Sequence, residues 1–172
     1  MLRFVMISIM FIICTYIGFY YGEKYRTRSS NLKEIQKAFI MLNSEISYSN
    51  TPLPDALKNI SNRVGEPISK ILLDMSINLN DVDIKGVYEA FTIAYKKYKD
   101  EINLSKDDYK ILSDFFKTIG ECDAVTQEKV FTVALENLNL NYIDANNEAN
   151  VNVKMYRTLG ISIGIMIAIF FI

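Results

Sequence analysis

Two aspartates, Asp81 and Asp83, are the nearest thing to a catalytic or metal-binding pair, and they flank Val82 in a segment that also holds Asn78 and Asn80. Such a series of oxygen ligands looks like half of a calcium loop, but it lacks the turn glycine and the bidentate glutamate of an EF-hand. We therefore interpret the segment as a solvated turn. The alternative stays open that these carboxylates serve a small membrane-anchored hydrolase or transferase.

The chain has few of the residues and motifs that other kinds of catalysis or ligand binding require. Its 172 residues include no His, which is the usual general base and the commonest metal ligand. Two Cys are too few for a zinc site, and Cys122 stands between two acids that disfavour a thiolate. No phosphate-binding glycine motif occurs, and a net charge of −1 argues against a nucleic-acid partner. We expect no enzyme activity, no cofactor, no metal site and no bound nucleic acid.

A polar and aromatic run, Glu45-Ile-Ser-Tyr48-Ser-Asn-Thr51-Pro52-Leu53, joins two predicted helices. As a structural corner, it would use Thr51 to cap the second helix, Pro52 at that helix's first position, and Glu45 or Tyr48 to bond the turn backbone. As a functional site, it would present a rigid knuckle to a partner protein. The two interpretations are compatible, and these five numbered residues are the first candidates for a partner interface.

The residues that would position this corner are helical. Between residues 23 and 157, apolar positions recur at helical spacing and no stretch alternates like a strand. The spacing predicts helices whose apolar positions span 32–46, 53–64, 68–79, 87–98, 109–119 and 131–156. About 135 residues in six helices can bury one core, so we expect an all-α, antiparallel helical bundle.

Local signals predict where these helices begin and end. Asn31 to Glu34 forms a plausible capping box for the first helix, and Gly65 ends the second. Ser105 caps the fifth helix, Gly120 stops it, and Asp123 caps the last. The surface near Gly120 and Asp123 is the second candidate for a partner interface.

The last helix is predicted to be long, because no Pro or Gly interrupts residues 121–159. It would leave the bundle and enter an apolar segment at the end of the sequence. Seven Asn between Asn137 and Asn152 are poor helix formers. They predict that this portion is frayed or bent.

Both ends of the sequence are apolar. Phe4 to Tyr21 carries no charge and, at about 1.5 Å per residue, reaches roughly 27 Å, close to a hydrocarbon core of about 30 Å. A cleaved signal peptide is the alternative, but the small residues of a cleavage site are missing after it. Leu159 to Ile172 is a shorter apolar segment. We predict a transmembrane anchor at 1–22, a helical bundle at 23–157 and a second transmembrane helix at 158–172.

Charges near the two segments predict the orientation. Lys24, Arg26 and Arg28 follow the first segment, and Lys154 and Arg157 precede the second. Because positive flanks stay in the cytoplasm, residues 23–157 are expected to be cytoplasmic in a protein that crosses the cell membrane twice.

Small residues recur every four positions along the second segment, at Gly160, Gly164 and Ala168. This spacing is typical of membrane helices that approach closely, although Gly is also simply common in such helices. The partner of this face would be the first segment or another chain.

At many of these positions the chain resembles the stage III sporulation protein AB family of endospore-forming bacteria. The most specific part is the Glu-Ile-x-Tyr-x-x-Thr-Pro-Leu run, although Ser49 stands where the family typically has Gly. The remaining matches are Gly22, Arg28, Leu32, Leu42, Tyr109-Lys-Ile-Leu112, Ile119-Gly120, Asp123, Gln127, Lys154-Met155 and Leu159-Gly160.

The resemblance implies a non-enzymatic platform in a channel between mother cell and forespore. The family is similar to the inner-membrane platform protein of type II secretion and type IV pilus machines, whose cytoplasmic domains are small helical bundles. By that analogy the chain would lie in the mother-cell (outer forespore) membrane. It would form a homo-oligomer there and would also contact other channel subunits. It would dock the cytoplasmic ATPase, stage III sporulation protein AA. A pore-forming, holin-like protein is disfavoured because neither apolar segment carries a polar stripe.

Overall fold

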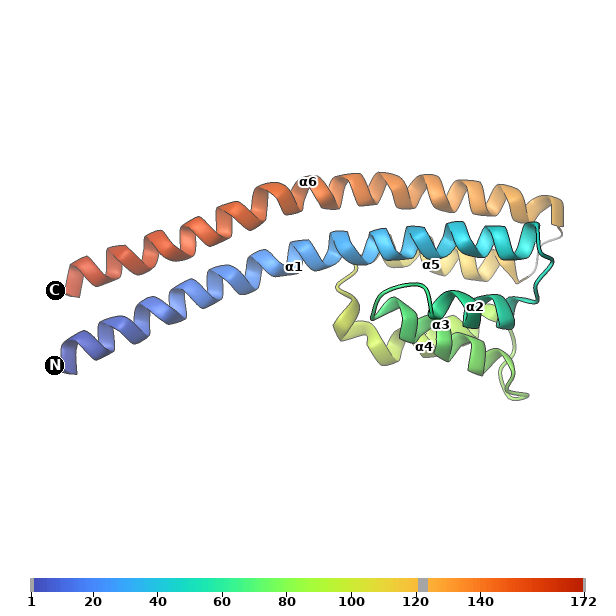
Figure 1. Ribbon diagram of the computed structural model, residues 1–172, viewed down its shortest axis with the longest axis horizontal. Coiled ribbons are helices and arrows are strands. Elements are labelled where there is room, and N and C mark those ends of the chain that lie inside the picture. The colour runs from blue at the N-terminus through green and yellow to red at the C-terminus, as the bar shows by residue number, and fades with distance from the viewer. Residues whose placement is uncertain (1, 121–123, 172) are drawn as a thin grey trace. The chain divides into compact units, whose positions relative to one another are not determined.

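The computed structural model describes residues 2–120 and 124–171, and all of its regular structure in these ranges is helical. Six helices follow in order: α1 (Leu2–Ser47), α2 (Leu53–Ser61), α3 (Ile68–Leu79), α4 (Val87–Ile102), α5 (Lys106–Ile119) and α6 (Ala124–Phe171) (Figure 1). The prediction of an all-α chain of six helices is therefore confirmed.

The chain divides into two compact units. Residues 30–142 form the first, called the bundle below, and residues 1–29 with 143–172 form the second, called the helix pair. The middle of the sequence supplies the bundle, and the two apolar ends supply the helix pair. The predicted boundaries at residues 22 and 157 stay a prediction.

Aromatic side chains fill the core of the bundle. The Phe39 ring lies 4.3 Å from that of Phe115, measured between centroids, and Phe91 lies 4.6 Å from Phe116. Phe131 of α6 reaches the same cluster, with its centroid 5.0 Å from Phe115. Such ring pairs contribute about 0.5–1.5 kcal/mol each beyond the area that they bury.

The predicted start of a helix at Asn31 is wrong, because α1 runs through this position without a break. Asn31 is buried, and its side-chain amide donates a hydrogen bond to the carbonyl oxygen of Ile102. The Glu34 carboxylate accepts the Gly65 backbone N–H at 2.8 Å instead of capping α1. Both residues therefore join α1 to distant parts of the bundle.

Helix α2 ends at Ser61, before the predicted stop at Gly65. The predicted limits of the fifth helix are confirmed, with Ser105 as its N-cap and Gly120 as its C-cap. The asparagine-rich part of α6 is not frayed, because the structure is helical throughout it. Leu138, Ala145 and Ala149 are buried there, so packing on one face of the helix outweighs the weak intrinsic preference of the Asn residues.

The helix pair is antiparallel. Three contacts show this: Phe11 of α1 lies against Gly164 of α6, Gly18 against Gly160, and Gly22 against Val153, so residue numbers rise along α1 as they fall along α6. Tyr156 stacks between Tyr21 and Tyr25, with ring centroids about 6.0 Å and 5.9 Å away. Small residues and stacked rings thus hold the two helices together.

Polar contacts join the helix pair beyond its apolar part. The Arg28 guanidinium lies 3.0 Å from the Glu148 carboxylate, and that of Arg157 lies 3.7 Å from Glu23.

Among the described residues, one stretch, Thr126–Phe170 of α6, is long and apolar enough to cross a membrane, with a best window of mean hydropathy 1.5.

Candidate functional site

The corner between α1 and α2 is built by backbone hydrogen bonds that turn the chain after Ser47. Tyr48 N–H donates to the Ser44 carbonyl at 3.1 Å, which closes the last turn of α1. Asn50 then adopts a left-handed conformation with φ +50°, which Asn tolerates better than most residues. The left-handed position is thus Asn50 and not Ser49, so Ser can replace the typical Gly there without a strained backbone.

Glu45 and Thr51 meet across this turn. Thr51 N–H donates to the Glu45 carbonyl at 3.0 Å, and the Thr51 hydroxyl donates to the Glu45 carboxylate at 3.0 Å. The prediction that Thr51 caps α2 is therefore wrong: Pro52 occupies the N-cap position and no side chain caps the helix. Pro52 also lies one position before the first helical residue, which is Leu53.

The corner presents an aromatic side chain to solvent. Tyr48 is 84 % exposed and Pro52 is exposed, whereas Glu45, Thr51 and Leu53 are half-buried. The partly buried hydrogen bonds between Thr51 and Glu45 fix the turn, and Tyr48 projects from it. The corner is therefore an ordered turn with an exposed Tyr48 side chain, and its role as a partner interface stays a prediction.

The C-terminal end of α5, which Gly120 caps, lies at the same end of the bundle as this corner (Figure 1). It adopts an ordinary helical φ of −75°, so no left-handed conformation requires glycine here. A Cβ at this position would lie 3.2 Å from Val87 Cγ2, which makes close approach to α4 the reason for a small residue. Asp123, its companion in the second candidate surface, lies outside the described residues.

Asp81 and Asp83 lie on an exposed loop between α3 and α4. The Asp81 carboxylate accepts the Asp83 backbone N–H at 3.2 Å, and Val82 between them is 98 % exposed. A catalytic carboxylate usually works where water is partly excluded, so this geometry is that of a solvated turn. In residues 2–120 and 124–171, no group of three or more acidic or Cys side chains is placed to hold a metal ion.

Gly160 and Gly164 of the helix pair are buried, and Ala168 is half-buried. A Cβ at Gly160 would lie 3.0 Å from the Cys14 carbonyl oxygen, and one at Gly164 would lie 2.7 Å from the Phe11 ring. The space around Gly18 of α1 is smaller still, because a Cβ there would lie 2.6 Å from the Tyr156 carbonyl oxygen. Gly18 was missed as a packing residue, although Cys14, Gly18 and Gly22 show the same four-residue spacing.

Asp108 is a buried acid whose position the sequence did not reveal. Its carboxylate accepts the Ser105 N–H at 2.9 Å and the Asn141 side-chain amide at 2.8 Å. It thereby completes the capping box of α5 and joins that helix to α6. The local motif could reveal the cap, but Asn141 is 33 residues away, so the second bond had no local signal.

Lys97 and Tyr95 of the bundle have raised pKa values, as does Lys70, through its hydrogen bond to Glu66. The Lys97 ammonium lies 2.6 Å from the Asp74 carboxylate, and this hydrogen bond is the main cause of a raised pKa for Lys97. Burial raises the pKa of the Tyr95 hydroxyl, and the charges of Tyr109 and Asp108 add to the effect. All three groups therefore stay protonated at neutral pH.

Known proteins resemble this chain in sequence and fold. The family model of stage III sporulation protein AB matches residues 3–172. Stage III sporulation protein AB of Bacillus subtilis (strain 168) is 29 % identical over 153 residues, which cover 89 % of each chain.

A solved structure of a stage III sporulation protein AB superposes with a TM-score of 0.66 and is 28 % identical. The match covers 72 % of this chain and 96 % of that one. The resemblance read from the corner residues is confirmed, and the chain belongs to the stage III sporulation protein AB family.

Proposed function

We propose that this protein is a non-enzymatic membrane platform of the sporulation channel. Its apolar ends cross the mother-cell membrane, its bundle lies in the cytoplasm, and the α1–α2 corner docks a cytoplasmic ATPase. The partner would be the cognate stage III sporulation protein AA, which the type II secretion analogy suggests. Other channel subunits would contact the membrane helices.

The helix pair supports the membrane part of this proposal. Apolar side chains of α1 point into solvent, such as Met6 at 65 % and Tyr16 at 70 % exposure. Burying them in lipid removes apolar surface from water at roughly 25 cal/mol per Å². The close glycine contacts are typical of helices that associate within a bilayer.

The exposed Tyr48 is the observation that carries the docking part. A large aromatic side chain exposed on an ordered turn gains free energy when a partner covers it. The Glu45–Thr51 hydrogen bond fixes the turn before binding, so little conformational entropy is lost on docking. Tyr is also enriched at the centres of protein interfaces.

The test measures binding of the ATPase to the full chain in lipid nanodiscs. Tyr48→Ala should weaken binding about 30-fold, since truncating a central interface Tyr costs about 2 kcal/mol. Tyr88→Ala is the matched control, because Tyr88 is an exposed tyrosine on a different helix, α4. Equal binding by wild type and Tyr48→Ala would rule out the corner as the docking site, and no binding by wild type would rule out the partner.

A further inference from the structure

We propose that copies of this chain bind one another head to tail, with the loop of residues 80–86 of one copy seated in a basic groove of the next. The groove lies between α4 and α5. This contact goes beyond the proposed function, because it requires no ATPase and does not use the α1–α2 corner.

The groove has a volume of about 450 Å³ and a cationic rim. Lys96 and Lys99 of α4 and Lys106 of α5 line it and are exposed. None of the three forms an ion pair with another residue in the described ranges. The described lining contains no carboxylate; its other members are Thr92, Tyr95, Leu104, Ser105 and Tyr109.

The floor of the groove is aromatic and uncharged. The Tyr95 and Tyr109 rings lie 4.7 Å apart between centroids, and Leu104 adds an aliphatic side chain. Burial keeps the pKa of Tyr95 above its usual value, so its hydroxyl carries no negative charge at neutral pH. An apolar side chain flanked by acids would therefore fit this surface.

A lone phosphate is a poorer occupant. Helix N-termini bind phosphate through free backbone N–H groups. At α5, the Asp108 N–H donates to the Ser105 hydroxyl, and the Ser105 N–H donates to the buried Asp108 carboxylate. The three lysines act instead as separate point charges around a wide floor, which suits two carboxylates spaced along a peptide.

The 80–86 loop has the matching chemistry. Val82, 98 % exposed, stands between the carboxylates of Asp81 and Asp83. The Asp83 N–H bond to the Asp81 carboxylate and the Ile84 N–H bond to the Asp81 carbonyl give the loop a defined shape. Val82 would enter the aromatic floor while the aspartates approach the lysines. Lys85 is a cation in the same loop, and its backbone N–H is bound by the Glu89 carboxylate at 2.7 Å.

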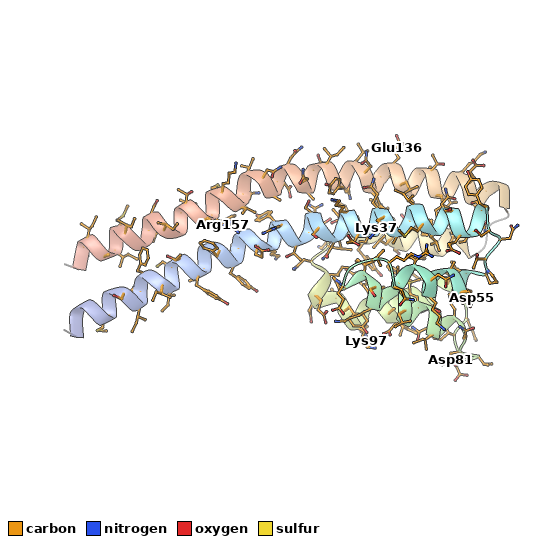
Figure 2. All side chains as sticks on the ribbon, viewed as in Figure 1. Lys37, Asp55, Asp81, Lys97, Glu136 and Arg157 are labelled. Carbon is orange, nitrogen blue, oxygen red and sulfur yellow. The ribbon has the colours of Figure 1, made fainter. Side chains whose placement is uncertain are left out.

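A chain cannot make this contact with itself. The loop ends where α4 begins, and the lysines of the groove, Lys96 and Lys99, lie nine and twelve residues beyond Val87, helical rises of about 14 and 18 Å. Figure 2 shows Asp81 on the loop before α4 and Lys97 farther along the helix. Because α4 is a continuous helix, it keeps the loop and the groove apart, and a second copy must supply the loop.

A contact between two different surfaces of the same chain is heterologous, so it repeats into a ring or an open filament. One loop in one groove buries little area, which predicts a weak contact. Confinement of many copies to one membrane would raise their effective concentration.

Cross-linking of the full chain in native membranes tests the contact. The background replaces both native cysteines (Cys14→Ser, Cys122→Ser), and the test chain adds Val82→Cys in the loop and Thr92→Cys in the groove. A short bismaleimide should then give a ladder of dimers, trimers and larger species. Either new cysteine alone should give no ladder, since one reactive position joins two chains at most.

Charge exchange tests the chemistry. Lys96→Glu with Lys99→Glu should reduce the cross-linked fraction at least tenfold, and so should Asp81→Lys with Asp83→Lys. Co-expression of a Val82→Cys chain carrying the lysine loop with a Thr92→Cys chain carrying the glutamate groove should restore the dimer between them. Lys117→Glu and Glu136→Lys, which change exposed charges elsewhere, should leave the ladder unchanged.

Absence of any ladder in the wild-type charge background would overturn the proposal. So would a ladder that persists equally in the charge-reversed chains, because proximity in a crowded membrane would then explain it. Restoration only in the exchanged pair cannot arise from misfolding of either chain alone.

Discussion

Asn31 shows how one buried amide joins two helices that are far apart in the sequence. Its side chain reaches the carbonyl oxygen of Ile102, the last residue of α4. A carbonyl at a helix C-terminus has no partner within its own helix, and Asn103 turns away with φ +45°. The Asn31 amide therefore satisfies a buried acceptor that would otherwise have none.

Asn31→Ala should destabilise the bundle by about 1–3 kcal/mol, because it leaves that buried carbonyl unpaired. Thermal unfolding of the full chain in detergent, followed by far-UV circular dichroism, measures the effect. Asn59→Ala, an exposed change on α2, should stay within about 0.5 kcal/mol of wild type. If both variants unfold together with wild type, the Asn31–Ile102 bond contributes nothing to stability.

Residues with local partners were predictable, and residues with distant partners were not. Ser105 and Asp108 are three residues apart, so their capping box could be read from spacing alone. Asn31 and Thr51 are also residue types that commonly cap helices. Their side chains instead form hydrogen bonds to other groups, Asn31 to the Ile102 carbonyl and Thr51 to the Glu45 carboxylate. Cap preference is a weak local signal that any better-placed partner overrides.

At the scale of elements, backbone contact through glycine determines how α1 and α6 meet. Gly18 and Gly160 approach so closely that a Cβ on Gly160 would lie 3.1 Å from the Gly18 Cα. A Cβ on Gly22, one turn further along, would have 3.5 Å of space to Val153. Two glycines of the same helix therefore differ in their tolerance of a methyl group.

Gly18→Ala should separate the two helices, because its methyl group would meet the Tyr156 backbone at 2.6 Å. Such overpacking typically costs about 1–3 kcal/mol. Near-UV circular dichroism reports the stack of Tyr156 on Tyr21 and Tyr25, and its signal should fall toward that of Tyr156→Leu. Gly22→Ala is the matched control and should keep the signal; loss of signal in both variants, or in neither, would contradict the geometry.

The continuity of α6 was predictable because no Pro or Gly interrupts residues 121–159, although the asparagines argued against it, and its buried stripe persists past them. The continuity of α1 was not, since Asn31 and Glu34 have the spacing of a capping box. Leu32 and Ile35 are buried in α1 just where that start was expected. Their burial favours a helix through this point, and packing decides the outcome.

At the scale of the whole molecule, the bundle and the helix pair have opposite surfaces. The bundle covers its aromatic core with charged residues, whereas the described ends of α1 and α6 expose apolar side chains. Composition along the chain predicted the apolar surface at both ends, because charges are nearly absent there. The partner surfaces could not be predicted in the same way, since they depend on which loops lie at one end of the bundle.

The proposed topology predicts the side on which each part of the chain reacts. The cysteine of an Asp100→Cys chain should not react with a membrane-impermeant maleimide in intact cells and should react after lysis. The reason is that the positive flanks would keep the bundle in the cytoplasm. A cysteine appended after Ile172 should react before lysis in vegetative cells that express the chain, where the far side of the cell membrane faces the medium. Both chains need the background without Cys14 and Cys122, and labelling of Asp100→Cys in intact cells would reverse the proposed orientation.

The meeting of Gly18 with Gly160 also sets an order of events during synthesis. Gly160 leaves the ribosome 142 residues after Gly18, which at about 5–20 residues per second takes roughly 7 to 28 seconds. Throughout that interval the Gly18 face of α1 has no partner helix from its own polypeptide to pack against. A neighbouring nascent copy could pair with it first, so the timing of translation, and not only the final packing, bears on which chains become joined.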